Sequence, residues 1–165
     1  IWKTMTDIML STHFTLSRAI KSRTAIEQGI DNMPSPDVIE VMKTTALNIL
    51  EPVRTYYDIP IIPSSFYRGP KLEVEICRRS IEKQLASGKV KTIEEYIAKK
   101  QHPKGQAVDF EVGTVDNEDL FQWCNSNLDF DQLILEFYKP ADPCSGWVHG
   151  SYVSPERNRH MILRY

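Results

Sequence analysis

The sequence has no long run of apolar residues and no paired cysteine motif. No stretch of its 165 residues approaches the roughly 18 apolar residues that a membrane-spanning helix needs, so we expect no membrane span. The cysteines are Cys77, Cys124 and Cys144. They show no CxxC spacing, and their odd number argues against a complete disulfide framework. We therefore expect reduced, mostly buried thiols in a protein made in the cytosol.

The sequence also lacks a strong net charge. Its formal charge is -2, which does not favour a nucleic-acid partner, and it has no recognised nucleic-acid-binding motif. The charge is nonetheless uneven: residues 68–104 hold ten Lys/Arg and five Asp/Glu, whereas residues 105–165 hold four Lys/Arg and ten Asp/Glu. Such a division is usually a solvated surface, and the alternative is a basic segment that attracts an acidic partner.

Length and hydrophobic pattern predict one domain over residues 1–165. The clearest helix covers residues 35–54, which open with a serine that can cap a helix and a proline that fits its first turn. Apolar residues recur on one face of this segment, and Pro52 should disturb its end. A shorter helix is predicted over residues 13–29, ending near Gly29.

The rest of the chain changes from helical patterns to alternating ones. We predict an extended segment over 59–68, helices over 73–88, 92–100 and 117–128, and strands over 106–112, 131–138 and 146–153. Early helices followed by strands predict an α+β fold with a largely antiparallel sheet. We divide the domain into a helical N-terminal part, residues 1–57, and a core, residues 58–165.

Chemistry is suggested by the stretch QHPKGQAVDF. His102 precedes Pro103, which should push it out of helical geometry, and Gly105 permits a turn before Asp109 on the next strand. His149, on another predicted strand, can supply a third ligand. Two neutral imidazoles and one carboxylate suit a catalytic zinc ion with an open position for water. The commoner alternative is a hydrogen-bonded structural His–Asp pair.

The stretches QHPKGQAVDF, LDFDQLILEF and GWVHGSY, in this order, resemble a known family. It comprises the zinc D-alanyl-D-alanine carboxypeptidases and murein endopeptidases, LAS-type metallopeptidases that share a fold with hedgehog signalling domains. Residues 13–54 and SSFYRGPKLE are similar to its phage-type branch, so the likeness covers nearly the whole chain. The resemblance implies a hedgehog-like α+β fold with a central, mostly antiparallel sheet flanked by helices. It also implies a D,D- or L,D-type carboxypeptidase or endopeptidase.

The resemblance also implies roles for single residues. It places the Zn2+ ligands at His102, Asp109 and His149. Arg68 falls on the arginine that binds a carboxylate or carbonyl oxygen of the substrate; its alternative is a surface ion pair. Glu136 is the best remaining candidate for the general base, and its alternative is a solvated strand carboxylate. Trp147 is expected beside the metal, either in contact with substrate or packed in the core.

The sequence departs from the family pattern in three places. Lys100 stands two positions before the first histidine, where the family usually has serine. A cation there should weaken metal binding unless its long stem carries the charge away. Many relatives place the base at the position of Gly146, which cannot act. A helical segment near 73–100 looks inserted beside the site, as a lid or as a docking surface for other virion proteins.

The family resemblance implies a biological setting. We expect a phage lysin or a virion component that cuts peptide bonds of the peptidoglycan peptide. Such a protein would reside in the phage virion, or in the host cytoplasm before lysis, and would act at the bacterial cell wall. The alternative is a catalytically retired peptidase-fold module with a structural or binding role in a virion. Hedgehog domains keep a metal site on this fold without evident peptidase activity.

Overall fold

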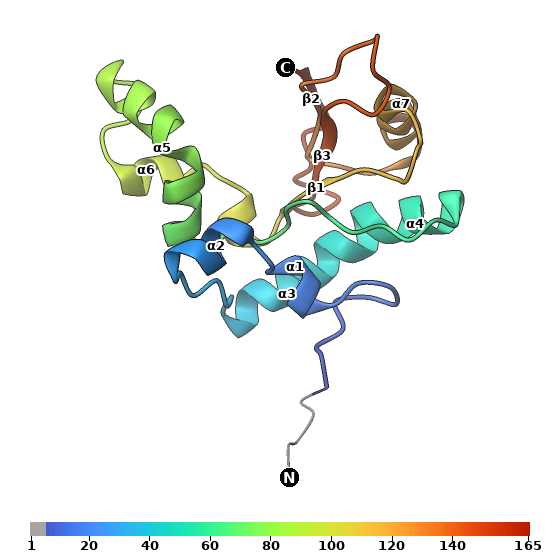
Figure 1. Cartoon of the computed structure of the whole chain (residues 1–165), viewed down its shortest axis with the longest axis horizontal. Helices are drawn as coiled ribbons and strands as arrows, with labels where there is room; N and C mark the ends of the chain where they lie inside the picture. The colour runs from blue at the N-terminus through green and yellow to red at the C-terminus, as the bar shows by residue number, and fades with distance from the viewer. Residues whose placement is uncertain (1–5) are drawn as a thin grey trace.

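The chain folds as an α+β domain in a computed structural model that describes residues 6–165 (Figure 1). Four strands form one mixed sheet in the order β1-β3-β2-β4, and helices surround it. The predicted α+β class is confirmed, whereas the likeness to hedgehog-type domains stays a prediction. Residues 1–5 of the predicted N-terminal part lie outside the described range.

Helices occupy most of the chain before the first strand. They are α1 (Leu16–Ala19), α2 (Arg23–Gln28), α3 (Pro36–Thr45), the π-helical turn η1 (Ala46–Leu50), α4 (Glu51–Tyr57), α5 (Pro70–Ala86), α6 (Ile93–Ala98) and the 3-10 turn η2 (His102–Lys104). The remaining elements are β1 (Ala107–Phe110), α7 (Asn117–Asn127), β2 (Gln132–Glu136), β3 (Trp147–Ser151) and β4 (Met161–Arg164). None of the helices among residues 6–165 is long and apolar enough to cross a membrane.

The longest helical run joins α3, η1 and α4 without a break. Its predicted start is confirmed, because the Ser35 hydroxyl accepts a hydrogen bond from the Val38 N–H at 3.4 Å. The predicted disturbance at Pro52 does not end the run, which continues to Tyr57. A proline ring clashes with the carbonyl four residues earlier. The π turn just before Pro52 widens the helix there, so this clash is relieved without a break.

The single helix predicted over residues 13–29 is wrong, because the structure has the two short helices α1 and α2 instead. The Ser22 hydroxyl accepts a hydrogen bond from the Ala25 N–H at 3.3 Å and so caps a new helix in the middle of the segment. The predicted end at Gly29 is confirmed by its left-handed conformation. Serine side chains compete for backbone groups in this way, which helical periodicity alone does not reveal.

The two helices predicted near 73–100 are present as α5 and α6. The first begins at Pro70, three residues earlier than its hydrophobic pattern suggested, since proline fits the first turn of a helix. The Thr92 hydroxyl caps α6 by accepting from the Glu95 N–H at 3.1 Å, as predicted. The pair has its own small core of Ile81, Val90 and Tyr96, and Figure 1 shows it standing apart from the sheet.

The sheet contains the three predicted strands and one more. β1 and β2 each pair antiparallel with β3, while β4 pairs parallel with β2, so the sheet is mixed. The four residues of β4 are too few to show a period in the sequence. Contacts distant in sequence hold β4 in place: the Met161 N–H donates to the Asp131 carbonyl oxygen at 2.9 Å, and Arg164 pairs with Glu118 at 2.5 Å.

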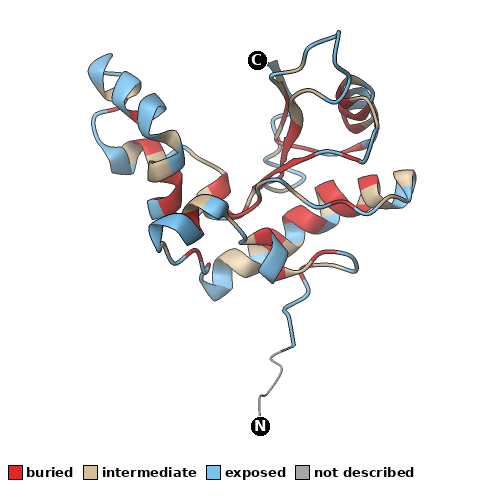
Figure 2. Ribbon diagram, in the orientation of Figure 1, coloured by how far each residue is buried: buried red, intermediate tan, exposed pale blue. Residues whose placement is uncertain are grey.

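The two faces of the sheet have different roles. One face carries Val108, Phe110, Leu133, Leu135 and Val148, all of them buried in the main core with residues of α3, η1, α4 and α7. Figure 2 shows buried residues concentrated where these helices meet the sheet. The opposite face carries Asp109, Ile134 and His149 in register across three strands. The alternation predicted for each strand therefore places the polar candidates together on one face.

The cysteines are all free. Cys124 is buried in the main core, where burial raises the pKa of its thiol to about 12. Cys77 is half-buried and Cys144 is exposed. The expectation of mostly buried thiols is therefore wrong for Cys144, which lies in the loop between β2 and β3.

Candidate metal centre

His102 lies in the turn between α6 and β1. Its predicted non-helical geometry is wrong, because His102 opens the 3-10 turn η2 with Pro103 in the second position. Proline is tolerated there because the first N–H groups of a helix have no acceptor within it. The predicted turn at Gly105 is confirmed by a φ of 73°. The Thr45 hydroxyl donates to the Gly105 carbonyl oxygen at 2.8 Å, which ties this turn to α3.

One ring nitrogen of His102 is fixed by the backbone, and the other is free. Nδ1 donates to the carbonyl oxygen of Phe66 at 2.7 Å, since a carbonyl can only accept. Phe66 lies in the predicted extended segment, which runs beside β1 through a bridge between Ser65 and Asp109. Nε2 is buried without a hydrogen-bond partner, and in a neutral ring it is the nitrogen that carries a lone pair for a metal ion. Metal-binding histidines typically have their second nitrogen held in this way.

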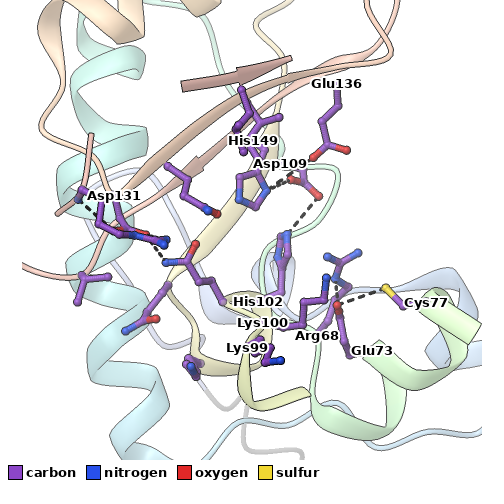
Figure 3. Close-up of a pocket in the computed structure, with 18 of the residues that line it drawn as sticks. Arg68, Glu73, Cys77, Lys99, Lys100, His102, Asp109, Asp131, Glu136 and His149 are labelled. Atoms are coloured by element: carbon purple, nitrogen blue, oxygen red, sulfur yellow. Dashed lines mark hydrogen bonds and ion pairs between the residues drawn. The ribbon is translucent and has the colours of Figure 1, made fainter. Parts of the chain in front are cut away.

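Asp109 and His149 lie opposite each other on β1 and β3. His149 Nδ1 is 2.8 Å from Asp109 Oδ1, and His102 Nε2 is 3.4 Å from Asp109 Oδ2. All three residues are buried, and Figure 3 shows their side chains pointing toward one another. The fold thus brings the three predicted ligands together from one turn and two strands.

The geometry of this cluster fits a metal ion. One ligand atom from each residue lies within 4.8 Å of the other two. In a tetrahedral zinc site with bonds of about 2.0–2.1 Å, neighbouring ligand atoms lie about 3.3 Å apart. His102 Nε2 lies 3.4 Å from Asp109 Oδ2, which matches this separation, whereas His149 Nδ1 lies 2.8 Å from the other oxygen, Oδ1, so the side chains would have to shift slightly for one oxygen to serve as the ligand. Residues His102, Asp109 and His149 therefore form a candidate site for a metal ion.

The carboxylate of this cluster is ionised. Burial alone would raise the pKa of Asp109, but the adjacent imidazoles of His102 and His149 outweigh burial. The pKa of Asp109 therefore lies well below its ordinary value. A buried carboxylate that stays charged beside two imidazoles provides the negative charge that a cation needs in a site of low polarity.

Glu136 ends β2 on the same face as the cluster. Its Oε1 lies 4.0 Å from His149 Nδ1, and its side chain is only 22% exposed. Burial raises the pKa of Glu136, and the neighbouring charge of Asp109 raises it further. Glu136 is thus not a freely solvated strand carboxylate. A carboxyl group with a raised pKa at the edge of a cluster can accept and release a proton during a reaction.

Arg68 is held by a glutamate that sequence reasoning missed. Arg68 Nε lies 2.8 Å from Glu73 Oε2, with the two side chains 17% and 1% exposed. The predicted alternative of an ion pair is therefore present, with Glu73 buried and Arg68 partly exposed at the wall of a cleft. The Cys77 thiol donates to Glu73 Oε1 at 3.3 Å. Helix α5 begins with Gly69 and Pro70, so Glu73 lies in its first turn, where acids are favoured. This helix-start pattern is the one feature of the sequence that could have identified Glu73.

Trp147 pairs with Glu136 across β2 and β3 and lines the same cleft. Its ring lies 5.3 Å from that of Phe137, and its Nε1–H is buried without a hydrogen-bond partner. A buried indole N–H usually finds an acceptor. Trp147 therefore lies beside Glu136 with its indole N–H buried, and its contact with substrate stays a prediction.

Lys100 is turned away from the metal candidate. Its Nζ lies 4.4 Å above the centre of the Tyr96 ring, in a cation–π contact with α6. The long side chain of Lys100 thus holds its charge against the Tyr96 ring at the wall of the cleft. Figure 3 shows Lys100 and Lys99 at the edge of the pocket, away from Asp109.

A cleft of about 900 Å³ opens onto the cluster. Residues of α5, of the segment after α6 and of β2 line it together with Trp147 and His149. The helical segment predicted as an insertion therefore forms part of the wall. Asp131, 1% exposed, also reaches the cleft, where Gln101 and Arg159 donate to it at 2.8 and 2.6 Å. No spacing in the sequence pointed to this contact.

The remaining histidines lie elsewhere. His13 Nδ1 is 2.7 Å from a carboxylate oxygen of Glu51, and His160 Nε2 is 3.2 Å from one of Asp129. Neither belongs to the cluster that can hold a metal.

Comparison of the chain with protein-family models, curated proteins and solved structures found no match. The function is therefore argued from the geometry of the site.

Proposed function

We propose that the protein is a zinc-dependent peptidase that hydrolyses peptide bonds of bacterial peptidoglycan. The observation that carries the proposal is the buried cluster of His102, Asp109 and His149, with His102 Nδ1 fixed by a carbonyl and Nε2 free. A purely structural His–Asp pair would not need a third ligand or a buried nitrogen without a partner. The open cleft beside the cluster gives a peptide access to it.

The donor set suits zinc better than calcium or magnesium, which prefer oxygen ligands. When bound, zinc lowers the pKa of water towards about 7 and polarises a carbonyl group. Glu136 Oε1 would accept a proton from the attacking water and pass it to the leaving amine. Its raised pKa and its position 4.0 Å from His149 support this role.

Arg68 and Trp147 bind the substrate in this proposal. The Nε of Arg68 is engaged by Glu73, which leaves the two terminal nitrogens of the guanidinium to hold a carboxylate or a carbonyl oxygen of the peptide. Trp147 lines the cleft next to Glu136 and offers the substrate an aromatic surface there. Each group is fixed by the protein before the substrate arrives, which lowers the cost of ordering it.

The family resemblance supports the finer part of the proposal, a phage lysin or virion-associated enzyme of the D,D- or L,D-type. Its setting would be the virion or the host cytoplasm before lysis, and it would act at the cell wall. No nucleic-acid partner is proposed. One side of the segment near 73–100 lines the cleft, where Glu73 binds Arg68. Its solvent-exposed side is the surface that we propose for contact with other virion proteins.

The experiment combines metal content with digestion of purified sacculi. The protein and its His102→Ala, His149→Ala and His160→Ala variants are compared by elemental analysis after zinc loading and dialysis. We expect one zinc per chain in the parent and in His160→Ala, and none in the other two. Hydrolysis is then measured by mass spectrometry of the peptides released from the sacculi. Full zinc without any released peptide would favour a retired peptidase-fold module over an enzyme.

A further inference from the structure

The backbone around Arg68 is held on both sides by one buried side chain. Asn32, 7% exposed, donates to the carbonyl oxygen of the residue before Arg68 at 3.1 Å and accepts from the N–H of the residue after it at 2.8 Å. The Phe66 carbonyl oxygen, two residues before Arg68, accepts from His102 Nδ1. Arg68 therefore starts from the same fixed segment that orients one of the metal-ligand candidates.

The charge of Arg68 acts on the groups of the candidate site. Arg68 lines the cleft together with Asp109, Glu136 and His149, and Figure 3 draws these side chains in one pocket. Burial is the largest influence on the pKa of Glu136 and raises it, whereas the charge of Arg68 lowers it. A substrate group bound at the cluster is therefore within the range of this charge.

Glu73 compensates the charge of Arg68 from inside the protein. Its Oε2 lies 2.8 Å from Arg68 Nε, and its side chain is only 1% exposed. The Cys77 thiol donates to the other carboxylate oxygen at 3.3 Å, which holds the Glu73 side chain in place. Two opposite charges at this distance interact strongly when little water screens them. Arg68 therefore offers the substrate hydrogen-bond donors, but little net charge.

Five other basic residues line the cleft, and four of them are held by other groups. The fifth, Arg157, is exposed to water, where salt screens its charge. Arg68 is therefore the basic residue of the cleft that is tied to the candidate site. Of the four, Lys99 pairs with Glu95 at 2.9 Å, Arg159 pairs with Asp131 at 2.6 Å, Lys100 lies over the Tyr96 ring, and Lys104 donates to the Ala98 carbonyl oxygen.

The cleft continues past the cluster in both directions along β2. Ile134 is in register with His149, and Gln132 and Glu136 line the cleft on either side of it. At about 3.3 Å per residue, the backbone of each lies about 7 Å from that of Ile134. The cleft thus has room for a substrate chain on both sides of the cluster, as cleavage of an internal peptide bond requires.

We propose that Glu73 determines the specificity of the site. By compensating the charge of Arg68, it disfavours a terminal carboxylate beside the bond that is cut and admits the neutral carbonyl group of an internal bond. The protein is then an endopeptidase rather than a carboxypeptidase. This inference rests on the proposed function, since it requires a peptide at the metal candidate. Glu73 lies in the segment near 73–100, so that segment contributes to the choice of substrate.

The test compares two peptides that differ only at the C-terminus. Both are fluorescein-labelled stem pentapeptides, one with a terminal carboxylate and the other with a neutral carboxamide. Their affinity for the zinc-loaded protein is measured by fluorescence anisotropy, and hydrolysis by mass spectrometry. We expect the parent to bind the carboxamide at least as tightly as the carboxylate. Glu73→Gln, which frees the charge of Arg68, should shift the ratio of affinities roughly tenfold towards the carboxylate.

The matched control is Glu75→Gln, because Glu75 lies on the same helix, pairs with Arg78 and does not line the cleft. It should leave the ratio unchanged. The Arg68→Gln/Glu73→Gln double variant removes both charges and should return the ratio to that of the parent. A loss of stability alone would not produce this reversal.

Several outcomes would overturn the role of Glu73. They are an unchanged ratio in folded Glu73→Gln, an equal shift in Glu75→Gln, and binding of neither peptide. A parent that prefers the carboxylate would overturn it even if Glu73→Gln does not fold. If that parent also releases C-terminal residues, the peptidase proposal still stands. The expected shift without any hydrolysis supports the role of Glu73 and argues against the peptidase.

Discussion

Gly146 stands against the end of the strand that carries Glu136. A Cβ added to Gly146 would lie 1.9 Å from the Glu136 carbonyl oxygen, and the φ of Gly146 is 66°. Both facts require glycine at this turn, because any side chain would collide with the backbone of β2. A carboxylate cannot be placed at position 146 without rebuilding the turn. Glu136, on the strand beside it, is the acid that the fold brings to the cluster.

Glu136→Gln should keep the zinc content and the fold but lower turnover roughly 100- to 10,000-fold, the usual contribution of a general acid–base group. The amide retains the shape of the side chain but cannot take a proton. Asp142→Asn is the matched control, since Asp142 is exposed and lies outside the cleft. Turnover of both variants is compared on one muropeptide at equal zinc occupancy. Near-normal turnover in Glu136→Gln with an inactive Asp142→Asn would show that the wrong carboxylate was named.

Glu73→Gln should lower the free energy of unfolding by about 2 kcal/mol, because it removes the counter-charge of Arg68, whose side chain is only 17% exposed. Glu75→Gln, which breaks the exposed Glu75–Arg78 pair of the same helix, should cost less than about 1 kcal/mol. Urea unfolding of both variants makes the comparison. Replacing Arg68 and Glu73 together by methionine should restore part of the loss. If the double variant loses as much stability as the Arg68→Met and Glu73→Met single variants added together, the two charges do not interact.

The pair between Glu118 on α7 and Arg164 on β4 should make the stability of the C-terminal strand depend on pH. Hydrogen bonds from Arg164 lower the pKa of Glu118 from 4.5 to about 2. The pair therefore stabilises the fold fully above about pH 4.5, and this contribution is lost as the pH falls towards 2. Glu118→Gln should cost about 1 kcal/mol near pH 7, since Arg164 is half-exposed. The difference from the parent, measured by urea unfolding, should shrink below pH 4; a constant difference would contradict this account.

The sequence was most informative where one local pattern decides the structure. The cap at Ser35, the cap at Thr92 and the alternation around Asp109 depend on neighbouring residues, and all three are present as predicted. The grouping of His102, Asp109 and His149 was also predicted: the turn at Gly105 and the strand alternation allowed it, and the family resemblance implied it.

Features that depend on distant contacts could not be read from the sequence. β4 is held by Asp131 and by the Glu118–Arg164 pair, and its own residues show no periodicity. The role of Glu73 depends on α5 packing beside Arg68, and the contact from Gln101 to Asp131 joins residues 30 positions apart. The π turn before Pro52 is a backbone adjustment that no residue pattern announces.

The central claim is that His102, Asp109 and His149 hold one zinc ion, and a zinc-loaded crystal structure tests it most directly. Diffraction data collected on both sides of the zinc absorption edge locate the metal independently of the protein atoms. The account predicts one anomalous peak about 2.0–2.1 Å from His102 Nε2, His149 Nδ1 and an Asp109 carboxylate oxygen. A peak bound by other residues, or an intact cluster without a peak in protein that contains one zinc per chain, would contradict it.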